Sequence, residues 1–356
     1  MLNLYGTTIE SLYIHKVGNK SRCEGVFLAK EETQLDDELR PLLKEFFLKP
    51  FREKDENYLK FTDDVSLQFN EMFQHSQNLF HTFDSFEPKL TEDYYSEIAK
   101  HLYEQSTHPH IKSGEVYICH LKDLLIENER VDGIGIFKSE IKQDFLQFVK
   151  DDSKLEMILT QGVNLGKLDK GCIIFNTAAN DGYKILSVDQ NRYDTKYWLD
   201  NFLGVIEAED SNFYTKKYLK FCQDFAKDVV LPAEDKKESV LFVNQAFNHF
   251  ASNDEFNEDA FLNEVVRNPE LLPEFKNYKA EKGPKYSIED LSTFPISNTA
   301  VKDSQKKFKS LIELDTNITI KMNFVNNESA DKFIEKGWDE EKQMYYYLCY
   351  FNKENN

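Results

Sequence analysis

The chain has 356 residues, 40% of them hydrophobic, with 29 Phe and 18 Tyr. This length and apolar content suffice for two ordinary domains with real cores, which excludes a disordered chain. No apolar run approaches the roughly 18 residues of a membrane span, and no basic and then apolar secretory signal opens the sequence, so we expect a cytoplasmic protein without a membrane partner.

The formal net charge is −19, whereas nucleic-acid-binding domains are usually basic. Any DNA-binding surface must therefore be local, because Lys and Arg have to neutralise the phosphates. The five cysteines include no Cys-x-x-Cys pair, which argues against a disulfide framework and a zinc ribbon. The sequence also lacks a complete glycine-rich phosphate loop and a Gly-x-Ser-x-Gly elbow. We expect no cofactor, no metal and no catalytic residue.

Alternating β-branched and aromatic residues predict strands in the first part of the chain, and apolar residues at spacings of three and four predict helices. Polar clusters at Asp151-Asp152-Ser153 and Asn180-Asp181-Gly182 predict turns between apolar runs. The predicted strands cover residues 4–17, 25–28, 114–121, 131–137, 172–175 and 183–188. The predicted helices cover residues 36–47, 63–83, 91–105, 195–203 and 211–229.

The stretch 131–140 joins a strand pattern to a polar end. Within it, Ile134 and Ile136 alternate with Gly133 and Gly135. Glycine weakens a strand, so two glycines on one face indicate that another backbone or a packed helix approaches closely.

A proline and a cluster of charges interrupt the apolar periodicity from Pro232 onward. We therefore place a domain boundary there, between residues 1–232 and residues 233–356. The predicted fold class is α+β, with a mixed helix and antiparallel-sheet domain followed by a smaller α+β domain. In the second domain, helices are predicted at 239–250, 258–266 and 328–336, a helix or loop at 269–285, and strands at 316–324 and 344–351.

Residues 296–313 combine a basic stripe with an apolar one. Lys302, Lys306 and Lys309 fall on one helical face, and Lys307 adjoins them. These lysines are the leading candidates for contact with DNA phosphates, and the alternative is an ordinary solvated helix surface. The apolar stripe consists of Val301, Phe308, Leu311 and Ile312.

Lys138 and Lys142 flank Glu140 at the end of the glycine-containing strand, and we add both lysines to the candidate DNA contacts. Together with Asp132, these residues also resemble the two carboxylates and the lysine of metal-dependent nucleases, in which the acids hold Mg²⁺. Alternatively, the same residues form salt bridges at the end of the strand and have no catalytic role. The nuclease therefore stands as a second alternative function.

Several short blocks carry a further signal: residues 101–106, 108–115, 132–140, 167–171, 197–203, 294–297 and 314–318. Their composition and order resemble the bacterial nucleoid-associated protein family of the NdpA or YejK type. This resemblance covers most of the chain. It implies a cytoplasmic protein at the bacterial nucleoid with DNA or nucleoid proteins as partners, and it implies no catalytic residue.

We therefore predict a non-enzymatic nucleoid-associated protein that binds DNA through a local basic surface. The first alternative is an acidic interaction protein that binds a basic nucleoid or DNA-processing partner, since the net charge of −19 suits such a role. A homodimer is among the expected partners, because DNA-associated proteins often pair their binding units.

Overall fold

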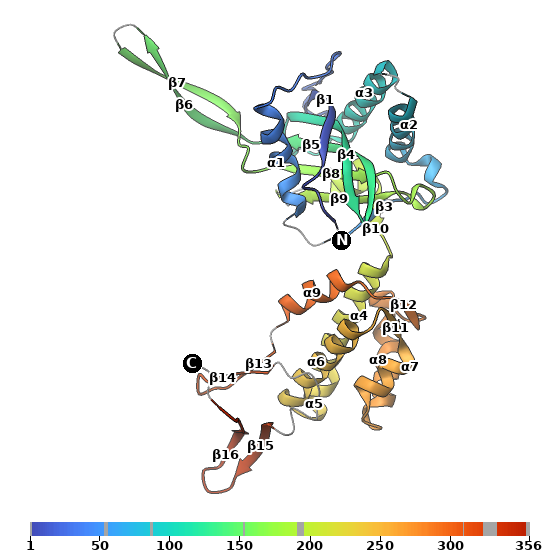
Figure 1. Ribbon diagram of the computed structural model, residues 1–356, viewed down its shortest axis with the longest axis vertical. Coiled ribbons are helices and arrows are strands. Elements are labelled where there is room, and N and C mark those ends of the chain that lie inside the picture. The colour runs from blue at the N-terminus through green and yellow to red at the C-terminus, as the bar shows by residue number, and fades with distance from the viewer. Residues whose placement is uncertain are drawn as a thin grey trace. The chain divides into compact units, whose positions relative to one another are not determined.

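The computed structural model describes residues 2–52, 56–85, 88–151, 154–190, 196–308, 310–322 and 333–353. The chain divides into two compact units, Met1–Ala208 and Glu209–Asn356. Both units contain helices and antiparallel strands, which confirms the α+β prediction (Figure 1). No helix in these ranges combines the length and the hydropathy needed to cross a bilayer.

The division after Ala208 differs from the boundary predicted at Pro232. The reason is that α4 (Ser211–Phe225) supplies core side chains to the second unit. The Phe225 ring lies 5.3 Å from Phe242 and 5.0 Å from Phe275, both of the second unit. Pro232 lies in the first turn of the short helix α5 (Leu231–Ala233), where proline is tolerated.

An eight-stranded antiparallel sheet forms the centre of the first unit (Figure 1), and its strand order is β10-β3-β9-β8-β5-β4-β1-β2. Long strands of β-branched and aromatic residues account for its middle, as the alternation predicts. The strands are β1 (Thr8–Val17), β2 (Val26–Phe27), β3 (Leu59–Phe61), β4 (Gly114–Ile126), β5 (Glu129–Ser139), β8 (Lys170–Phe175), β9 (Lys184–Asp189) and β10 (Val205–Glu207).

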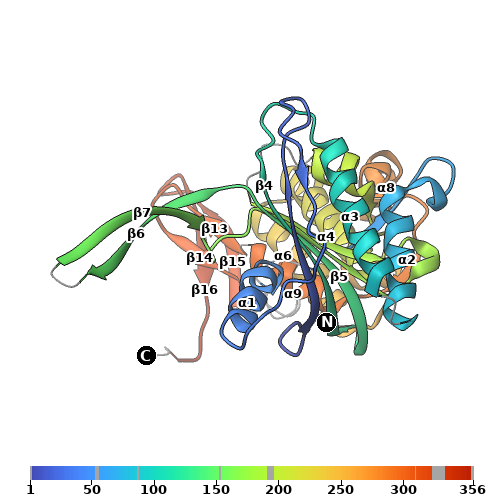
Figure 2. The same ribbon diagram turned by 90° about the horizontal axis from the view of Figure 1, so that it is seen from above.

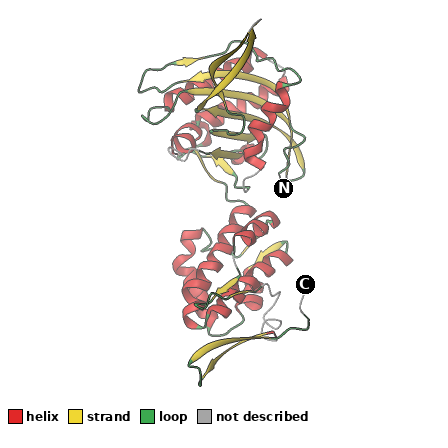
Figure 3. Cartoon of the chain, turned by 90° about the vertical axis from the view of Figure 1, so that its left-hand side faces the viewer, coloured by secondary structure: helices red, strands yellow, loops and turns green. Residues whose placement is uncertain are grey.

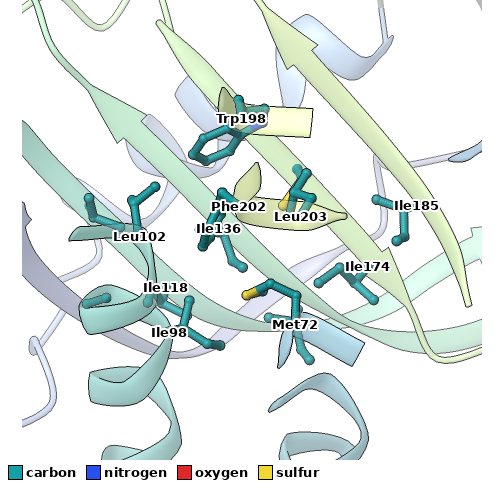
Figure 4. Close-up of a cluster of buried hydrophobic side chains, with 14 of the residues drawn as sticks. Met72, Ile98, Leu102, Ile118, Ile136, Ile174, Ile185, Trp198, Phe202 and Leu203 are labelled. Atoms are coloured by element: carbon teal, nitrogen blue, oxygen red, sulfur yellow. The ribbon is translucent and has the colours of Figure 1, made fainter. Parts of the chain in front are cut away.

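Each face of this sheet carries its own hydrophobic core. On one face, α2 (Glu71–Ser85), α3 (Pro88–Gln105) and the π-helix η3 (Tyr197–Leu203) cover the isoleucines of β4, β5, β8 and β9 (Figure 4). On the other face, α1 (Leu39–Arg52) packs against the alternate side chains of the same strands. The helix predicted at 63–83 is divided, because Asn70 separates the 3-10 turn η1 (Leu67–Phe69) from α2.

The glycines of β5 lie on the α1 face, where neighbouring side chains use the space that a Cβ would occupy. A Cβ on Gly135 would lie 2.6 Å from the Phe137 ring and 2.9 Å from Cys119 Sγ. The Phe137 ring itself stacks on Phe47 of α1, with centroids 4.3 Å apart. The close approach predicted for these glycines is therefore made mainly by side chains.

Two strands of the first unit leave the sheet and pair only with each other. β6 (Lys142–Asp151) and β7 (Lys154–Val163) form an antiparallel hairpin that extends away from the body of the unit (Figures 1 and 2). We call this hairpin the arm. Asp152 and Ser153 of its predicted turn lie outside the described residues. The other predicted turn, at Asn180-Asp181-Gly182, joins β8 to β9 through the 3-10 turn η2 (Ala179–Asp181).

The second unit is a group of helices with short hairpins at its edge (Figure 3). Its core is rich in aromatic rings, and the Tyr218 ring packs against those of Phe250, Phe256 and Phe261. The helices after α5 are α6 (Lys236–Ser252), α7 (Glu258–Phe261), α8 (Leu271–Tyr286) and α9 (Asn298–Lys307), with π-helices η4 (Ala226–Val230) and η5 (Leu262–Val266). The hairpins pair β11 (Glu255–Asn257) with β12 (Thr293–Pro295), β13 (Leu311–Glu313) with β14 (Thr319–Lys321), and β15 (Ile334–Asp339) with β16 (Met344–Cys349).

Two predicted helices of this unit are wrong in part. The helix predicted at 296–313 ends at Lys307, because Leu311 and Ile312 belong to β13 and pair with β14. The helix predicted at 328–336 is contradicted from Ile334 onward, where β15 pairs with the aromatic strand β16. Residues 328–332 lie outside the described part of the chain.

The tight space at Gly135 gives a stability prediction. Gly135→Ala should lower the free energy of unfolding of the first unit by about 1–3 kcal/mol, because the new methyl group displaces the stacked Phe137 ring. Urea unfolding followed by Trp198 fluorescence measures this, in a Trp338→Phe background that leaves Trp198 as the one tryptophan. Gly6→Ala is the control, since nothing lies within 4 Å of its Cβ position. Equal urea midpoints for the two variants would contradict the packing account.

A buried histidine in β1 makes the stability of the first unit depend on pH. Burial lowers the pKa of His15 from 6.5 to about 4. Its Nδ1 accepts a hydrogen bond from the Ala29 backbone N–H at 3.1 Å, and its Nε2 has no partner among the described residues. Between these two pH values the unfolded chain binds a proton that the folded chain does not, so stability falls as the pH is lowered.

His15→Asn should remove this contribution while keeping an acceptor for the Ala29 N–H. The loss of stability between pH 6.5 and pH 4 should shrink by on the order of 3 kcal/mol relative to the parent protein. The same Trp198 urea assay, repeated across the pH range, measures the change. His110→Asn is the control, because His110 is exposed. An unaltered pH slope in His15→Asn would refute the assignment.

Candidate functional site

The structure distributes the candidate lysines over both units. Lys302, Lys306 and Lys307 lie on α9 of the second unit, whereas Lys138 and Lys142 lie on β5 and β6 of the first. Lys309 lies outside the described residues. The two groups of lysines therefore have to be assessed separately.

α9 presents its lysines because its opposite face is fixed in the core of the second unit. Ser297 caps the helix by accepting a hydrogen bond from the Ala300 N–H at 3.3 Å. Ala300 and Val301 are buried. Lys302, Lys306 and Lys307 are exposed, in the helix turns that the spacing predicts. Their one acidic neighbour on the helix is Asp303, whose carboxylate lies 3.5 Å from Lys306 Nζ.

A second basic helix, which the sequence analysis missed, packs beside α9. The Ser297 N–H donates to Thr215 Oγ1 of α4 at 3.0 Å, and the two helices run side by side (Figure 1). α4 contains three lysines and a single carboxylate, Asp224, which pairs with Lys220 at 2.7 Å. So basic a helix is unusual in so acidic a chain and could have been noticed. We define the basic surface as these lysines together with those of α9: Lys216, Lys217, Lys220, Lys302, Lys306 and Lys307.

Lys138 is buried rather than presented to solvent. Its side chain is 0% exposed, and its ammonium donates to the Lys112 carbonyl at 2.9 Å and to Glu140 Oε1 at 2.8 Å. Burial lowers the pKa of Lys138, and the Glu140 carboxylate opposes that effect. An ammonium held in this way cannot reach a phosphate unless the end of β5 opens. The structure therefore speaks against Lys138 as a DNA contact.

Several segments that are distant in sequence meet around this ion pair. The Tyr197 hydroxyl donates to Glu140 Oε1 at 3.1 Å, and the Tyr197 ring lies 5.8 Å from Lys138 Nζ and 5.2 Å from Lys170 Nζ. Asp169 Oδ2 accepts the backbone N–H groups of Glu140 at 2.6 Å and Ile141 at 3.0 Å. This buried charged cluster fixes the backbone where β5 ends and the arm begins.

The cluster gathers residues from three of the short blocks in the sequence, at 132–140, 167–171 and 197–203. The family described as nucleoid-associated protein YejK matches residues 14–345 of the chain. The chain belongs to this family. Among curated proteins, none matches it. Membership of the YejK family supports a nucleoid-associated role.

Lys142, the other candidate of the first unit, lies at the base of the arm. It forms an ion pair with Glu115 of β4, and its side chain is part-exposed. A cation paired in this way attracts phosphate only weakly. Lys142 is therefore a poorer candidate in this YejK-family chain than Lys302 of α9, which is exposed.

The metal-dependent nuclease arrangement does not form. Asp132 lies near the start of β5 and Glu140 directly follows its end, roughly 26 Å away at the usual rise of a strand, so the two carboxylates cannot share a Mg²⁺ ion. Asp132 instead accepts a hydrogen bond from His120 Nε2 at 2.8 Å, and Glu140 is the partner of Lys138. In the described ranges, no group of three His, Cys, Asp or Glu side chains could hold a metal ion. The nuclease alternative is wrong for these residues.

The structural role of Lys138 can be tested by removing its ammonium group, which leaves the Glu140 carboxylate without its cation. Lys138→Met should destabilise the first unit by about 3–5 kcal/mol, because it leaves the Glu140 carboxylate buried without a cation. Adding Glu140→Gln should recover most of the loss, since the neutral amide still accepts the Tyr197 hydroxyl. Urea unfolding of the two variants measures both effects. A stable Lys138→Met protein that retains less DNA would instead identify Lys138 as a phosphate contact.

Proposed function

We propose that this protein binds DNA without enzymatic activity, through the basic surface on α4 and α9. The observation that carries the proposal is the exposure of Lys302, Lys306 and Lys307 on a helix whose other face is buried. In a chain with a net charge of −19, lysines gathered on two adjacent helices offer the local attraction that phosphate binding needs. The nucleoid association of the family agrees with such a role.

The chemistry of the surface also predicts what kind of binding to expect. Lysine is a compact, mobile charge that contacts the phosphate backbone and reads no base sequence. Lys302 and Lys306 are separated by about 6 Å along the helix axis, so both can contact one strand of a duplex. Binding should therefore be independent of sequence and should weaken steeply as salt rises.

A carboxylate-lined hollow in the first unit favours a second candidate function, which is binding to a basic protein. The hollow has a volume of about 360 Å³, and its lining includes Asp63, Asp64, Glu71 and Asp200. Such a lining suits Lys or Arg side chains of a partner that itself associates with nucleic acid. The net charge of −19 would favour the same encounter.

Charge reversal on α9 tests the DNA proposal. Lys302→Glu, Lys306→Glu and Lys307→Glu together should weaken binding to a random-sequence duplex by at least tenfold at low salt. The slope of log affinity against log salt should also fall by about three, because up to three phosphate contacts are lost. Gel-shift titrations at 50 and 200 mM salt give both quantities.

The matched control reverses three lysines elsewhere in the same unit, Lys276, Lys282 and Lys342, and so changes the net charge equally. Binding by this control should fall far less than in the α9 variant. Equal losses would show that total charge, and not the basic surface, governs retention. If neither variant nor the parent protein binds duplexes at low salt, direct DNA binding is wrong. Capture of a basic partner that requires Asp63, Asp64 and Asp200 would then support the second candidate.

A further inference from the structure

The arm exposes one face whose middle is apolar, while the Asp144 and Gln161 pair and Lys150, which is opposite Leu155, stand toward its two ends. Cross-strand pairs place Leu146 opposite Leu159 and Phe148 opposite Met157, with Leu155 next along the same face. These five side chains are between 56% and 69% exposed. We call this set the apolar arm face. Because side chains alternate along a strand, the face forms a continuous strip over both strands.

The opposite face of the arm differs in composition and is partly covered by its own residues. There, Gln147 stands opposite Ile158 and Val149 stands opposite Glu156. The Phe145 ring rests against Gly162 of the paired strand, where a Cβ would lie 3.3 Å from it. The apolar arm face is therefore the side of the hairpin that needs a partner.

A two-stranded ribbon with such a face is marginally stable in water without further packing. We propose that the apolar arm face docks against the same face of a second copy of this chain, which makes the protein a homodimer. Two ribbons stacked face to face form a small two-layer sandwich about a twofold axis, with the Phe148 and Met157 pair near its centre. This inference does not depend on DNA binding.

The available area agrees with a second copy as the occupant. Five large apolar side chains that are more than half exposed offer on the order of 600 Å² per chain, so two copies would bury on the order of 1,200 Å², which is the lower limit for a specific, stable interface. Because the middle of the surface is apolar on both chains, it is complementary to itself. Lys150 lies on the same face near the end of the arm and is exposed, so its long side chain can keep the ammonium group in water at the rim of the interface.

Charge also favours this occupant over DNA. Between residues 142 and 163 the arm carries three lysines and four carboxylates, a near-neutral balance in a chain whose net charge is −19. Lys142 and Lys154 are paired with Glu115 and Glu156. A ribbon that entered a DNA groove would need free cations along it. By contrast, a near-neutral arm of about 33 Å lets two chains join away from the body of the first unit.

Sedimentation velocity on the full-length protein over a range of concentrations tests the proposal. The parent protein should sediment with twice the mass of one chain. Met157→Lys should sediment as a monomer at the same concentration, because two ammonium groups would meet inside the interface. Ile158→Lys is the matched control, since it places the same charge on the neighbouring residue of the other face, and it should remain a dimer.

A complementary pair separates loss of the interface from loss of the fold. Met157→Lys and Met157→Glu should each be monomeric, and mixing them should restore a dimer that contains one chain of each. A monomeric parent protein, a dimeric Met157→Lys, or a mixture that stays monomeric would each overturn the proposal. So would a monomeric parent protein whose DNA binding depends on Met157, because the arm would then be a DNA-binding element.

Discussion

The placement of positive charge is the constraint on which the rest of this structure depends. In the first unit, Lys138 and Lys170 are buried and pair with Glu140 and Asp189. Such cations stabilise local geometry and are unavailable to a polyanion. In the second unit, Lys220 of α4 and the lysines of α9 are exposed on helices whose apolar faces are buried. Lysine therefore stabilises the fold where it is buried and can attract an anion where it is exposed.

The sheet of the first unit was predictable because its signals are local. Alternating apolar residues and an Asp-Gly turn specify neighbouring antiparallel strands such as β8 and β9. The arm was not predictable in the same way. Leu146, Phe148 and Met157 are residues typical of a core strand. Only the structure shows that they are exposed, with no other element of the described first unit packed on them. A periodic pattern identifies the apolar face of a strand but not what packs on it.

The candidate site shows a similar limit. Helical spacing predicted the exposed lysines of α9 correctly, since one turn of helix places Lys302 and Lys306 on one face. It failed after Lys307, where pairing with β14 draws Leu311 and Ile312 into a strand. It also failed at Lys138, whose partners include the Lys112 carbonyl from a distant segment. Tertiary contacts of this kind leave no periodic trace in the sequence.

Association of two chains through their arms would change what a modest basic surface can achieve. Each surface offers few lysines, and the acidic remainder of the chain opposes its approach to DNA. A dimer carries two such surfaces, so that once one is bound the second meets DNA at a high effective concentration, which can raise avidity by roughly 10²- to 10⁴-fold without a new contact. Pairing through a near-neutral arm would thus allow a strongly anionic protein to remain on a polyanion.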